Sequence, residues 1–146
     1  MDETDAIILD VLKENARHSL SDISERANLS IPAIRERIKK LENKGAIKCY
    51  TTILNKDFFK KDMSCFIMVT LSNDEDGNTE FFRLIEEEPE ILECHFITGE
   101  YEYMLKVVTD NSKSLERLLK KFRMMKCIQF TKSTTVLSTV KEKYSI

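Results

Sequence analysis

The stretch from Leu29 to Gly45, LSIPAIRERIKKLENKG, decides the fold of the first part of the chain. Its apolar residues recur at spacings of three and four, the period of an amphipathic helix: Ile31, Ile34, Ile38 and Leu41. Ser30 is a typical N-cap residue, and Pro32 is tolerated in a first turn, where its missing N–H has no partner to lose. Gly45 ends the apolar period. The pattern predicts a helix over residues 31–43.

Two shorter helical patterns come before this stretch. Residues 4–15 carry apolar side chains at helical spacing, and either Asp2 or Thr4 can cap the helix. Residues 21–27 follow a polar break, with Ser21 as the expected N-cap. The chain therefore starts with three predicted helices that are joined by short turns.

The turn before the third helix and the segment after it complete the pattern. Asn28 is suited to a tight turn because asparagine tolerates the left-handed conformation. After Gly45, residues 46–54 lose the helical period and predict a β-hairpin, which we call the wing segment. Three helices followed by a hairpin predict a winged helix-turn-helix domain over residues 1–54, with the third helix as its recognition helix.

A second unit follows a polar and basic connector at residues 55–63. Its predicted elements are, in order, strand 65–71, polar turn 73–77, helix 79–88, strand 91–98, strand 101–109, helix 112–122 and strand 127–140. The order β-α-β-β-α-β is typical of a ferredoxin-like domain, here over residues 64–146. The expected fold class of the whole chain is α+β.

The strands of this second unit carry apolar residues at both odd and even positions. In the first strand, Ile67 and Val69 belong to one face, and Phe66 and Met68 belong to the other. Both helices of a ferredoxin-like unit lie on one face of the sheet, which leaves the second face open. We therefore expect another subunit of this protein to cover the open face.

Composition excludes several classes of protein. The chain has 146 residues, a net charge of −2, 33% charged residues and 42% hydrophobic residues, as in a soluble globular protein. No apolar run approaches the ~20 residues of a transmembrane helix, and the acidic N-terminus differs from a signal peptide, so we expect a cytoplasmic protein with no membrane partner. The sequence has no nucleophile–base pair, no closely spaced metal ligands and no Gly-rich phosphate loop. We predict no catalytic residue, no metal site and no cofactor, and we do not expect an enzyme.

Charge is distributed unevenly along the chain. Residues 26–48 carry seven basic and two acidic side chains, whereas residues 1–25 have a net charge of −5 and residues 74–102 a net charge of −10. Within the acidic part, glutamates 86–88 are expected to form a solvated charge run. The basic segment coincides with the predicted recognition helix and is suited to a polyanion.

The predicted recognition helix turns a polar face away from its apolar stripe. Basic side chains on this face can neutralise phosphates, and Arg35 or Glu36 can reach base edges in the major groove. The predicted partner is double-stranded DNA. The predicted DNA-binding residues are Ser30, Pro32, Ala33, Arg35, Glu36, Arg37, Lys39, Lys40, Lys44 and Lys48.

The segment from Thr98 to Tyr103, TGEYEY, is the most distinctive part of the second unit. Gly99 permits a sharp turn, and two carboxylates alternate with two aromatic rings after it. Carboxylates beside aromatic walls can hold an ammonium group, such as the α-amine of an amino acid. A plain hairpin with surface glutamates is the alternative. The predicted effector-binding residues are Gly99, Glu100, Tyr101, Glu102 and Tyr103.

Three motifs in the chain resemble the Lrp/AsnC family, the feast/famine transcription regulators of bacteria and archaea. The family's opening D-x-x-D-x-x-I-L-x-x-L-x-x-N-A-R is matched at Asp2, Asp5, Ile8, Leu9, Leu12, Asn15, Ala16 and Arg17. Its recognition segment is matched at Leu29, Ser30, Ile34, Arg37, Ile38, Lys40, Leu41, Glu42, Gly45 and Ile47. Its hairpin T-G-D-Y-D-Y-L-L is matched from Thr98 to Leu105, with glutamate at both aspartate positions. The resemblance covers essentially the whole chain.

The resemblance implies a DNA-binding transcription regulator with a ferredoxin-like effector domain. It also implies that this domain forms dimers, that dimers often assemble into octamers or larger rings, and that an amino acid commonly binds between dimers near the Gly99 hairpin. The alternative is a DNA-organising protein of the same fold that binds no ligand.

Overall fold

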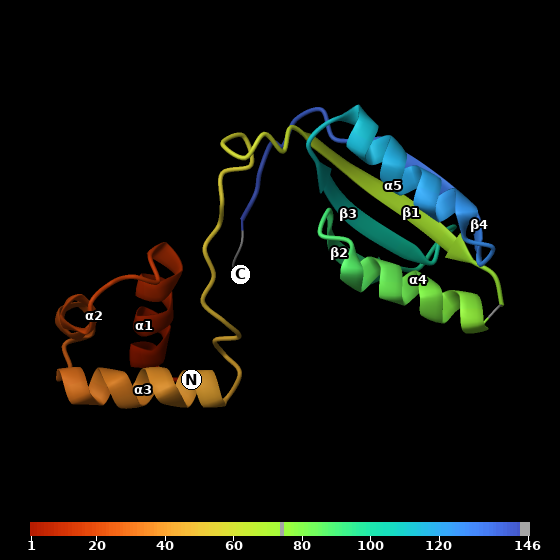
Figure 1. The fold of residues 1–146 in the computed structure, drawn as a ribbon. Coiled ribbons are helices and arrows are strands. Elements are labelled where there is room, and N and C mark those ends of the chain that lie inside the picture. Colours follow the sequence, from red (N-terminus) through yellow and green to blue (C-terminus); the bar gives the residue numbers. More distant parts are fainter. Residues whose placement is uncertain (74, 144–146) are drawn as a thin grey trace. The chain divides into compact units, whose positions relative to one another are not determined.

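The computed structural model describes residues 1–73 and 75–143, which form two compact units (Figure 1). Of the described residues, the first unit contains 1–53 and Lys143, and the second contains 54–73 and 75–142. Each unit has a hydrophobic core of its own. The predicted domain boundaries, with a connector at residues 55–63, stay a prediction.

Three helices build the first unit: α1 (Glu3–Glu14), α2 (Leu20–Ala27) and α3 (Ile31–Asn43). Its core consists of five aliphatic residues, each no more than 4% exposed: Ile8, Val11, Ile23, Ile34 and Leu41. Asn28 ends α2 with φ 50° and ψ 46°, which confirms the predicted left-handed turn before α3. The predicted bounds of the third helix are confirmed as well.

The first two helices begin at capping boxes. Asp2 is the N-cap of α1, and the side chains of Asp2 and Asp5 each accept a hydrogen bond from the backbone N–H of the other residue. The predicted N-cap of α2, Ser21, is wrong. Ser19 caps this helix, because its capping box with Asp22 satisfies two backbone N–H groups at once.

The wing segment does not form the predicted β-hairpin. Residues 46–54 contain no strand, and the backbone N–H groups of Ala46 and Ile47 bond back to the carbonyl of Leu41 in α3. A two-stranded hairpin is only marginally stable by itself. The segment also lacks a glycine or asparagine at which a tight two-residue turn could form.

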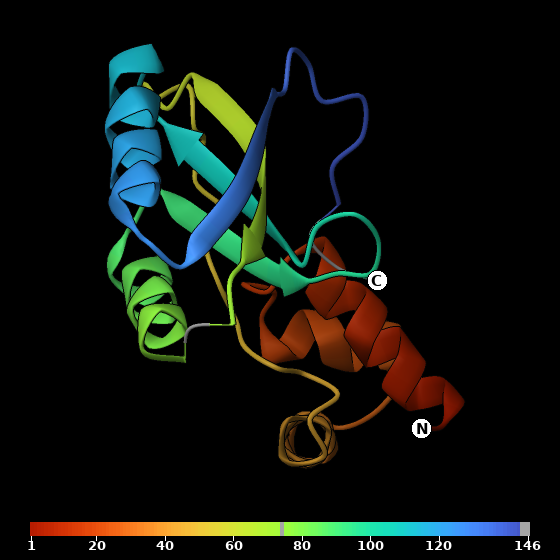
Figure 2. The same cartoon turned by 90° about the vertical axis from the view of Figure 1, so that its right-hand side faces the viewer.

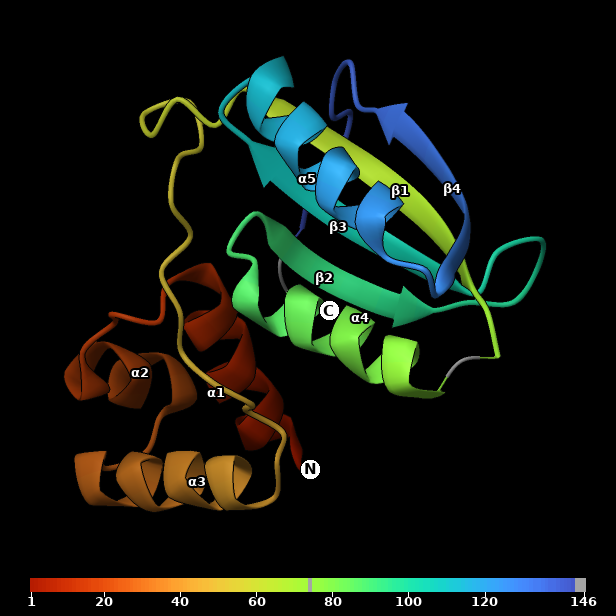
Figure 3. The ribbon, with the colours of Figure 1, turned by 45° about the vertical axis from the view of Figure 1, so that its right-hand side comes forward.

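Four antiparallel strands and two helices build the second unit: β1 (Met63–Leu71), α4 (Glu75–Glu87), β2 (Ile91–Phe96), β3 (Tyr103–Thr109), α5 (Ser112–Met124) and β4 (Ile128–Thr135). The strand order is β2-β3-β1-β4. Figure 2 shows α4 and α5 on the same face of the sheet, and Figure 3 shows them side by side. This is the ferredoxin-like arrangement, so the predicted α+β fold class is confirmed.

Several predicted boundaries in the second unit are wrong, two of them by more than two residues. The predicted polar turn 73–77 overlaps α4, which begins at Glu75 because acidic side chains are favourable at the positive end of a helix. The predicted strand 127–140 ends at Thr135. Its partner there is Cys65, close to the start of β1, so little of that strand remains for later residues to pair with.

The predicted solvated run of glutamates 86–88 is wrong at its last residue. Glu88 is 8% exposed, and its carboxylate forms an ion pair with Lys121 of α5. Glu90 is 6% exposed and lies 3.0 Å from a guanidinium nitrogen of Arg117, also on α5. Burial of the two carboxylates is tolerated because each has a cationic partner. These ion pairs join the α4–β2 turn to α5.

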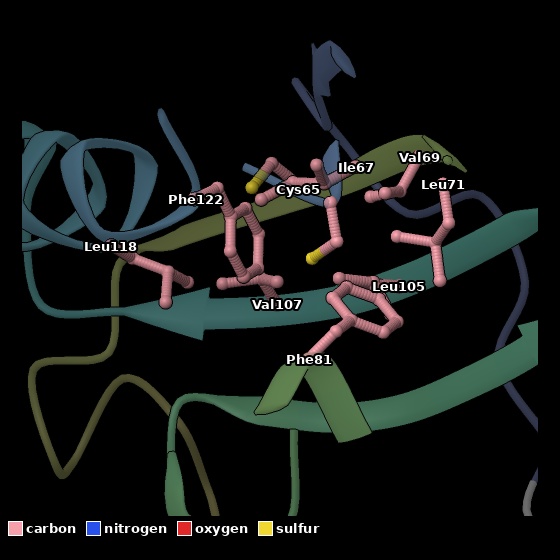
Figure 4. Close-up of a cluster of buried hydrophobic side chains, with 10 residues drawn as sticks. Cys65, Ile67, Val69, Leu71, Phe81, Leu105, Val107, Leu118 and Phe122 are labelled. Carbon is pink, nitrogen blue, oxygen red and sulfur yellow. The ribbon is translucent and has the colours of Figure 1, made fainter. Parts of the chain in front are cut away.

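The core of the second unit lies between the sheet and the two helices (Figure 4). Alternate residues of β1 point toward the helices: Cys65, Ile67, Val69 and Leu71. Phe81 of α4 and Phe122 of α5 are fully buried against them, with ring centroids 6.4 Å apart. Phe66 and Met68 lie on the other face and are half exposed. That a second subunit covers this face stays a prediction.

Candidate DNA-binding surface and effector hairpin

Helix α3 presents a basic surface on the side opposite its buried residues. Ile34 and Leu41 are buried in the core of the first unit, which turns the polar positions between them outward. Most of the predicted DNA-binding residues are exposed: Ser30, Pro32, Arg35, Glu36, Lys39, Lys40, Lys44 and Lys48. Ala33 and Arg37 are half-buried. Most of the predicted set is therefore accessible to a partner, and Glu36, Lys39, Lys40 and Lys44 line one common hollow.

Lysines gather around a shallow hollow on this surface. The hollow has a volume of ≈ 690 Å³. Its lining includes three lysines and Arg37 together with two acidic residues: Lys39, Lys40, Lys44, Arg37, Asp2 and Glu36. Within residues 1–73 and 75–143, none of these three lysines forms an ion pair. Their charge is therefore available to a phosphate group of an incoming polyanion.

Arg37 is bonded within the first unit. Its Nη1 atom lies 2.6 Å from Asp2 Oδ2 and 2.7 Å from Asp5 Oδ1. Hydrogen bonds from Arg37 hold the pKa of both carboxyl groups below the ordinary value of 3.8, and the two carboxylates raise the pKa of the guanidinium. Because the folded pKa values are lowered, both ion pairs persist at neutral pH and are lost only as the pH falls through those values.

The bond between Arg37 and the two aspartates was not predicted from the sequence. Asp2 was expected only as a helix cap and Arg37 only as a DNA contact. A signal was present, because Asp2 and Asp5 are three residues apart and so lie on one side of α1. Nothing in the sequence indicates that this side meets the middle of α3.

Tyr50 ties the wing segment to α3. Its hydroxyl donates a hydrogen bond of 2.9 Å to Glu42 Oε1. Partial burial and the charge of Glu42 raise the pKa of Tyr50 to about 12, so the hydroxyl keeps its proton at neutral pH. This contact, which the sequence pattern does not indicate, holds the middle of the wing segment against α3.

The turn between β2 and β3, residues 97–102, carries the predicted effector site. Gly99 has a φ of 130°, which residues with a side chain rarely adopt. The Ile97 N–H donates to the Glu102 carbonyl at 2.7 Å and closes the hairpin. Glu102 also accepts at Oε2 from the Leu71 N–H at 2.8 Å, while its own N–H donates to the Val69 carbonyl. Glu102 therefore fastens the hairpin to the end of β1.

The other predicted effector residues differ in their surroundings. Glu100 is exposed and forms no hydrogen bond or ion pair within the part of the chain that the structure describes. The Tyr103 ring packs among Phe81, Phe82 and Phe96, with centroid distances of 5.7, 5.6 and 5.4 Å. Phe96 is 76% exposed, so this aromatic group reaches the surface. A carboxylate and an apolar surface thus lie in the same part of the unit.

The described residues contain no group of three or more His, Cys, Asp or Glu side chains that could hold a metal ion. No helix formed by these residues has the length and apolar character needed to cross a membrane.

Two family models match successive parts of the chain. A model of winged helix-turn-helix DNA-binding domains matches residues 1–48, and the model of the Lrp/AsnC ligand binding domain matches residues 64–146. The chain belongs to the Lrp/AsnC family. The Lrp/AsnC resemblance of its three sequence motifs is confirmed by these matches. The chain is accordingly a DNA-binding transcription regulator with a ligand-binding domain.

Characterised Lrp/AsnC proteins are similar over most of their length. The HTH-type transcriptional regulator LrpA of Mycobacterium tuberculosis is 30% identical over 95% of this chain and 91% of its own. The leucine-responsive regulatory protein of Escherichia coli is 31% identical over 82% of this chain and 73% of its own. A solved complex of a Neisseria meningitidis transcriptional regulator with L-methionine has a TM-score of 0.94 at 29% identity, covering 100% of this chain and 96% of that one.

Proposed function

We propose that this Lrp/AsnC regulator acts in the cytoplasm as a dimer that binds a roughly palindromic operator. In this proposal, α3 of each subunit enters the major groove of one half-site, and the two half-sites are about 34–36 Å apart. The exposed basic surface of α3 is the observation that carries the proposal. Arg35 and Glu36 read base edges, with Ser30, Pro32 and Ala33 at the leading end of the helix, and Lys39, Lys40, Lys44 and Lys48 bind phosphates.

We further propose that an amino acid regulates DNA binding from the Gly99 hairpin, at an interface between dimers in an octamer. Glu100 supports this proposal because its carboxylate is exposed and can bind the ammonium group of the ligand. Glu102 would hold the hairpin in shape, while Tyr101 and the aromatic group around Tyr103 would contact the apolar part of the ligand. L-Methionine in the related Neisseria meningitidis protein supports an amino acid as the effector.

Specific DNA binding is tested by fluorescence anisotropy with the duplex upstream of the protein's own gene and a scrambled duplex, across a series of salt concentrations. The upstream duplex is expected to bind at least about 10³-fold more tightly than the scrambled duplex. Equal affinity for both duplexes would favour the ligand-independent, DNA-organising function. Absence of binding to either duplex at low salt would contradict the whole proposal.

Effector binding is tested by the unfolding temperature of the protein with and without L-methionine. At a concentration of 100 times Kd, the ligand is expected to add about 2.7 kcal/mol of stability. Glu100→Gln should lose this shift, because a neutral amide no longer attracts the ammonium group. Glu86→Gln, at an exposed position of α4, is the matched control and should keep it. Light scattering on the same samples reports any change in the number of subunits.

An unchanged shift in Glu100→Gln would show that this carboxylate does not contact the ligand. If none of the amino acids raises the unfolding temperature of the unmodified protein, the effector proposal fails and the DNA-organising function gains support.

A further inference from the structure

Arg37 differs from the other basic residues of α3 in what it contacts. Its guanidinium binds Asp2 and Asp5, at 2.6 and 2.7 Å, and both acids belong to the capping box that starts α1. The side chain of Asp5 is only 13% exposed, and that of Arg37 is 32% exposed. A single cluster of charge-assisted hydrogen bonds therefore joins the first turn of α1 to the middle of α3.

These bonds supply a kind of restraint that the hydrophobic core cannot. The core contacts of α3 are made by Ile34 and Leu41, and hydrophobic contact has no preferred direction. The apolar stripe sets which face of α3 is buried, but a small rotation of the helix about its axis leaves Ile34 and Leu41 buried while it moves the polar side chains on the opposite face. The guanidinium has its donors in a rigid plane, so binding two carboxylates restricts the rotation of α3 about its axis.

The charges of the two aspartates act against a direct role of this cluster in binding DNA. Asp2 lines the same hollow as Lys39 and Lys40, where a carboxylate repels phosphate. Two carboxylates on one guanidinium leave the cluster with a net negative charge. The positive charge of Arg37 is already neutralised by Asp2 and Asp5, so little of it is left to attract a phosphate.

We propose that Arg37 is a positioning residue that sets the rotation of the recognition helix and makes no phosphate contact. This inference rests on the proposed insertion of α3 into the major groove. It replaces the DNA-binding role expected for Arg37 from the sequence. Arg35, Glu36 and Lys39 then depend on Arg37 for their alignment with the groove.

Variants of the two aspartates distinguish the two possible roles of Arg37, because the roles predict different changes in operator affinity relative to scrambled-duplex affinity. Asp2→Asn and Asp5→Asn remove charge but keep an oxygen that can accept the capping hydrogen bonds, so the start of α1 is preserved. If Arg37 positions α3, each variant lowers the ratio of operator affinity to scrambled-duplex affinity by about tenfold, which is the effect of one lost base contact. If Arg37 binds phosphate, each variant removes a repulsive charge and releases the guanidinium, so both duplexes are bound more tightly and the ratio stays unchanged.

Arg37→Gln adds a second readout, the dependence of affinity on salt. The plot of log K against log salt should keep its slope in Arg37→Gln, whereas Lys40→Gln should reduce the slope by about 0.9, the effect of one lost phosphate contact. Glu3→Gln is the matched control for the aspartate variants, because Glu3 is exposed in the same turn of α1. It should leave specific affinity unchanged within about twofold.

Thermal unfolding of each variant separates loss of alignment from loss of fold. Asp2 is half exposed at the chain start, so Asp2→Asn keeps the test valid if Asp5→Asn fails to fold. Weaker operator binding relative to the scrambled duplex by a folded aspartate variant, with an unchanged slope in Arg37→Gln, supports the inference. An unchanged ratio of operator affinity to scrambled-duplex affinity in the folded aspartate variants, or a slope reduced by about 0.9 in Arg37→Gln, overturns it. Lack of specific binding by the unmodified protein overturns the proposed function itself, and with it this inference.

Discussion

Replacing Lys39, Lys40 and Lys44 together by glutamine is expected to abolish most of the electrostatic part of DNA binding. Each lysine that neutralises a phosphate contributes about 0.9 to the slope of log K against log salt, so the slope should fall by about 2.7. Over the tenfold range from 1 M to 0.1 M salt, a slope of 2.7 corresponds to about 500-fold in affinity, which the triple variant should no longer gain. Because phosphate contacts carry no sequence information, the operator and a scrambled duplex should lose affinity by similar factors.

The control for this triple variant is a matched change of charge in the second unit. Lys113, Arg123 and Lys126 are exposed and form no ion pair within the described residues, so their replacement by glutamine lowers the net charge equally. The control should keep the slope of the unmodified protein in the same anisotropy titration. A slope that falls equally in both triple variants would mean that overall charge, and not the surface of α3, determines the affinity.

Phe81→Ala is expected to destabilise the second unit by about 3–5 kcal/mol, since it removes a fully buried ring from a close-packed core. The Phe81 ring lies 6.4 Å from the Phe122 ring of α5 and 5.7 Å from the Tyr103 ring of β3, so it packs against both the other helix and the sheet. Figure 4 shows Phe81 and Phe122 within this core. The first unit has a separate core around Ile8 and Ile34. Hydrogen exchange followed by mass spectrometry should therefore show faster exchange in residues 63–135 and unchanged protection in α1–α3.

Phe82→Ala is the natural comparison because Phe82 is the next residue of α4 and is 42% exposed. Phe82→Ala loses edge contacts with Tyr103 and Phe81, each worth about 0.5–1.5 kcal/mol, but removes less buried area than Phe81→Ala and should therefore destabilise the unit less. Equal destabilisation by the two variants would contradict the position of the core that the structure assigns. A loss of protection in α1–α3 of Phe81→Ala would contradict the separation of the two cores.

Local patterns predicted much of the fold. The bounds of α3 follow from a stripe of apolar residues, a capping serine and Gly45, all of which act within a few residues of one another. The ferredoxin-like order likewise follows from the alternation of helical and strand periods. Errors occurred where two local signals competed, as between Ser19 and Ser21 at the start of α2. They also occurred where a strand needs a partner to exist, as in the wing segment and at the end of β4.

The candidate sites were predicted only in part. An exposed basic face on α3 can be derived from helix periodicity, because the apolar stripe identifies the side that is buried. Periodicity does not show which basic residues of that face are free to bind phosphate and which are paired with acids of the same chain. The sequence assigned Arg37 and Lys40 to the same role, yet Arg37 is bonded to two aspartates more than 30 positions away along the chain. In the same way, Glu100 and Glu102 are equivalent in the sequence pattern, but in the structure only Glu102 accepts a hydrogen bond from the Leu71 N–H.

Properties that depend on neighbouring residues could be predicted without a structure: the three helices of the first unit, the order of strands and helices in the second, the basic segment, and the motifs of the Lrp/AsnC family. The tertiary structure alone decided the partners of charged side chains, including Arg37 with Asp2 and Asp5, Glu88 with Lys121, and Glu102 with β1. The physical reason is one of range. Helix periodicity and capping act within about one turn, whereas a charged group finds its partner by where folding places it in space, and many arrangements of the same charges fit one hydrophobic pattern.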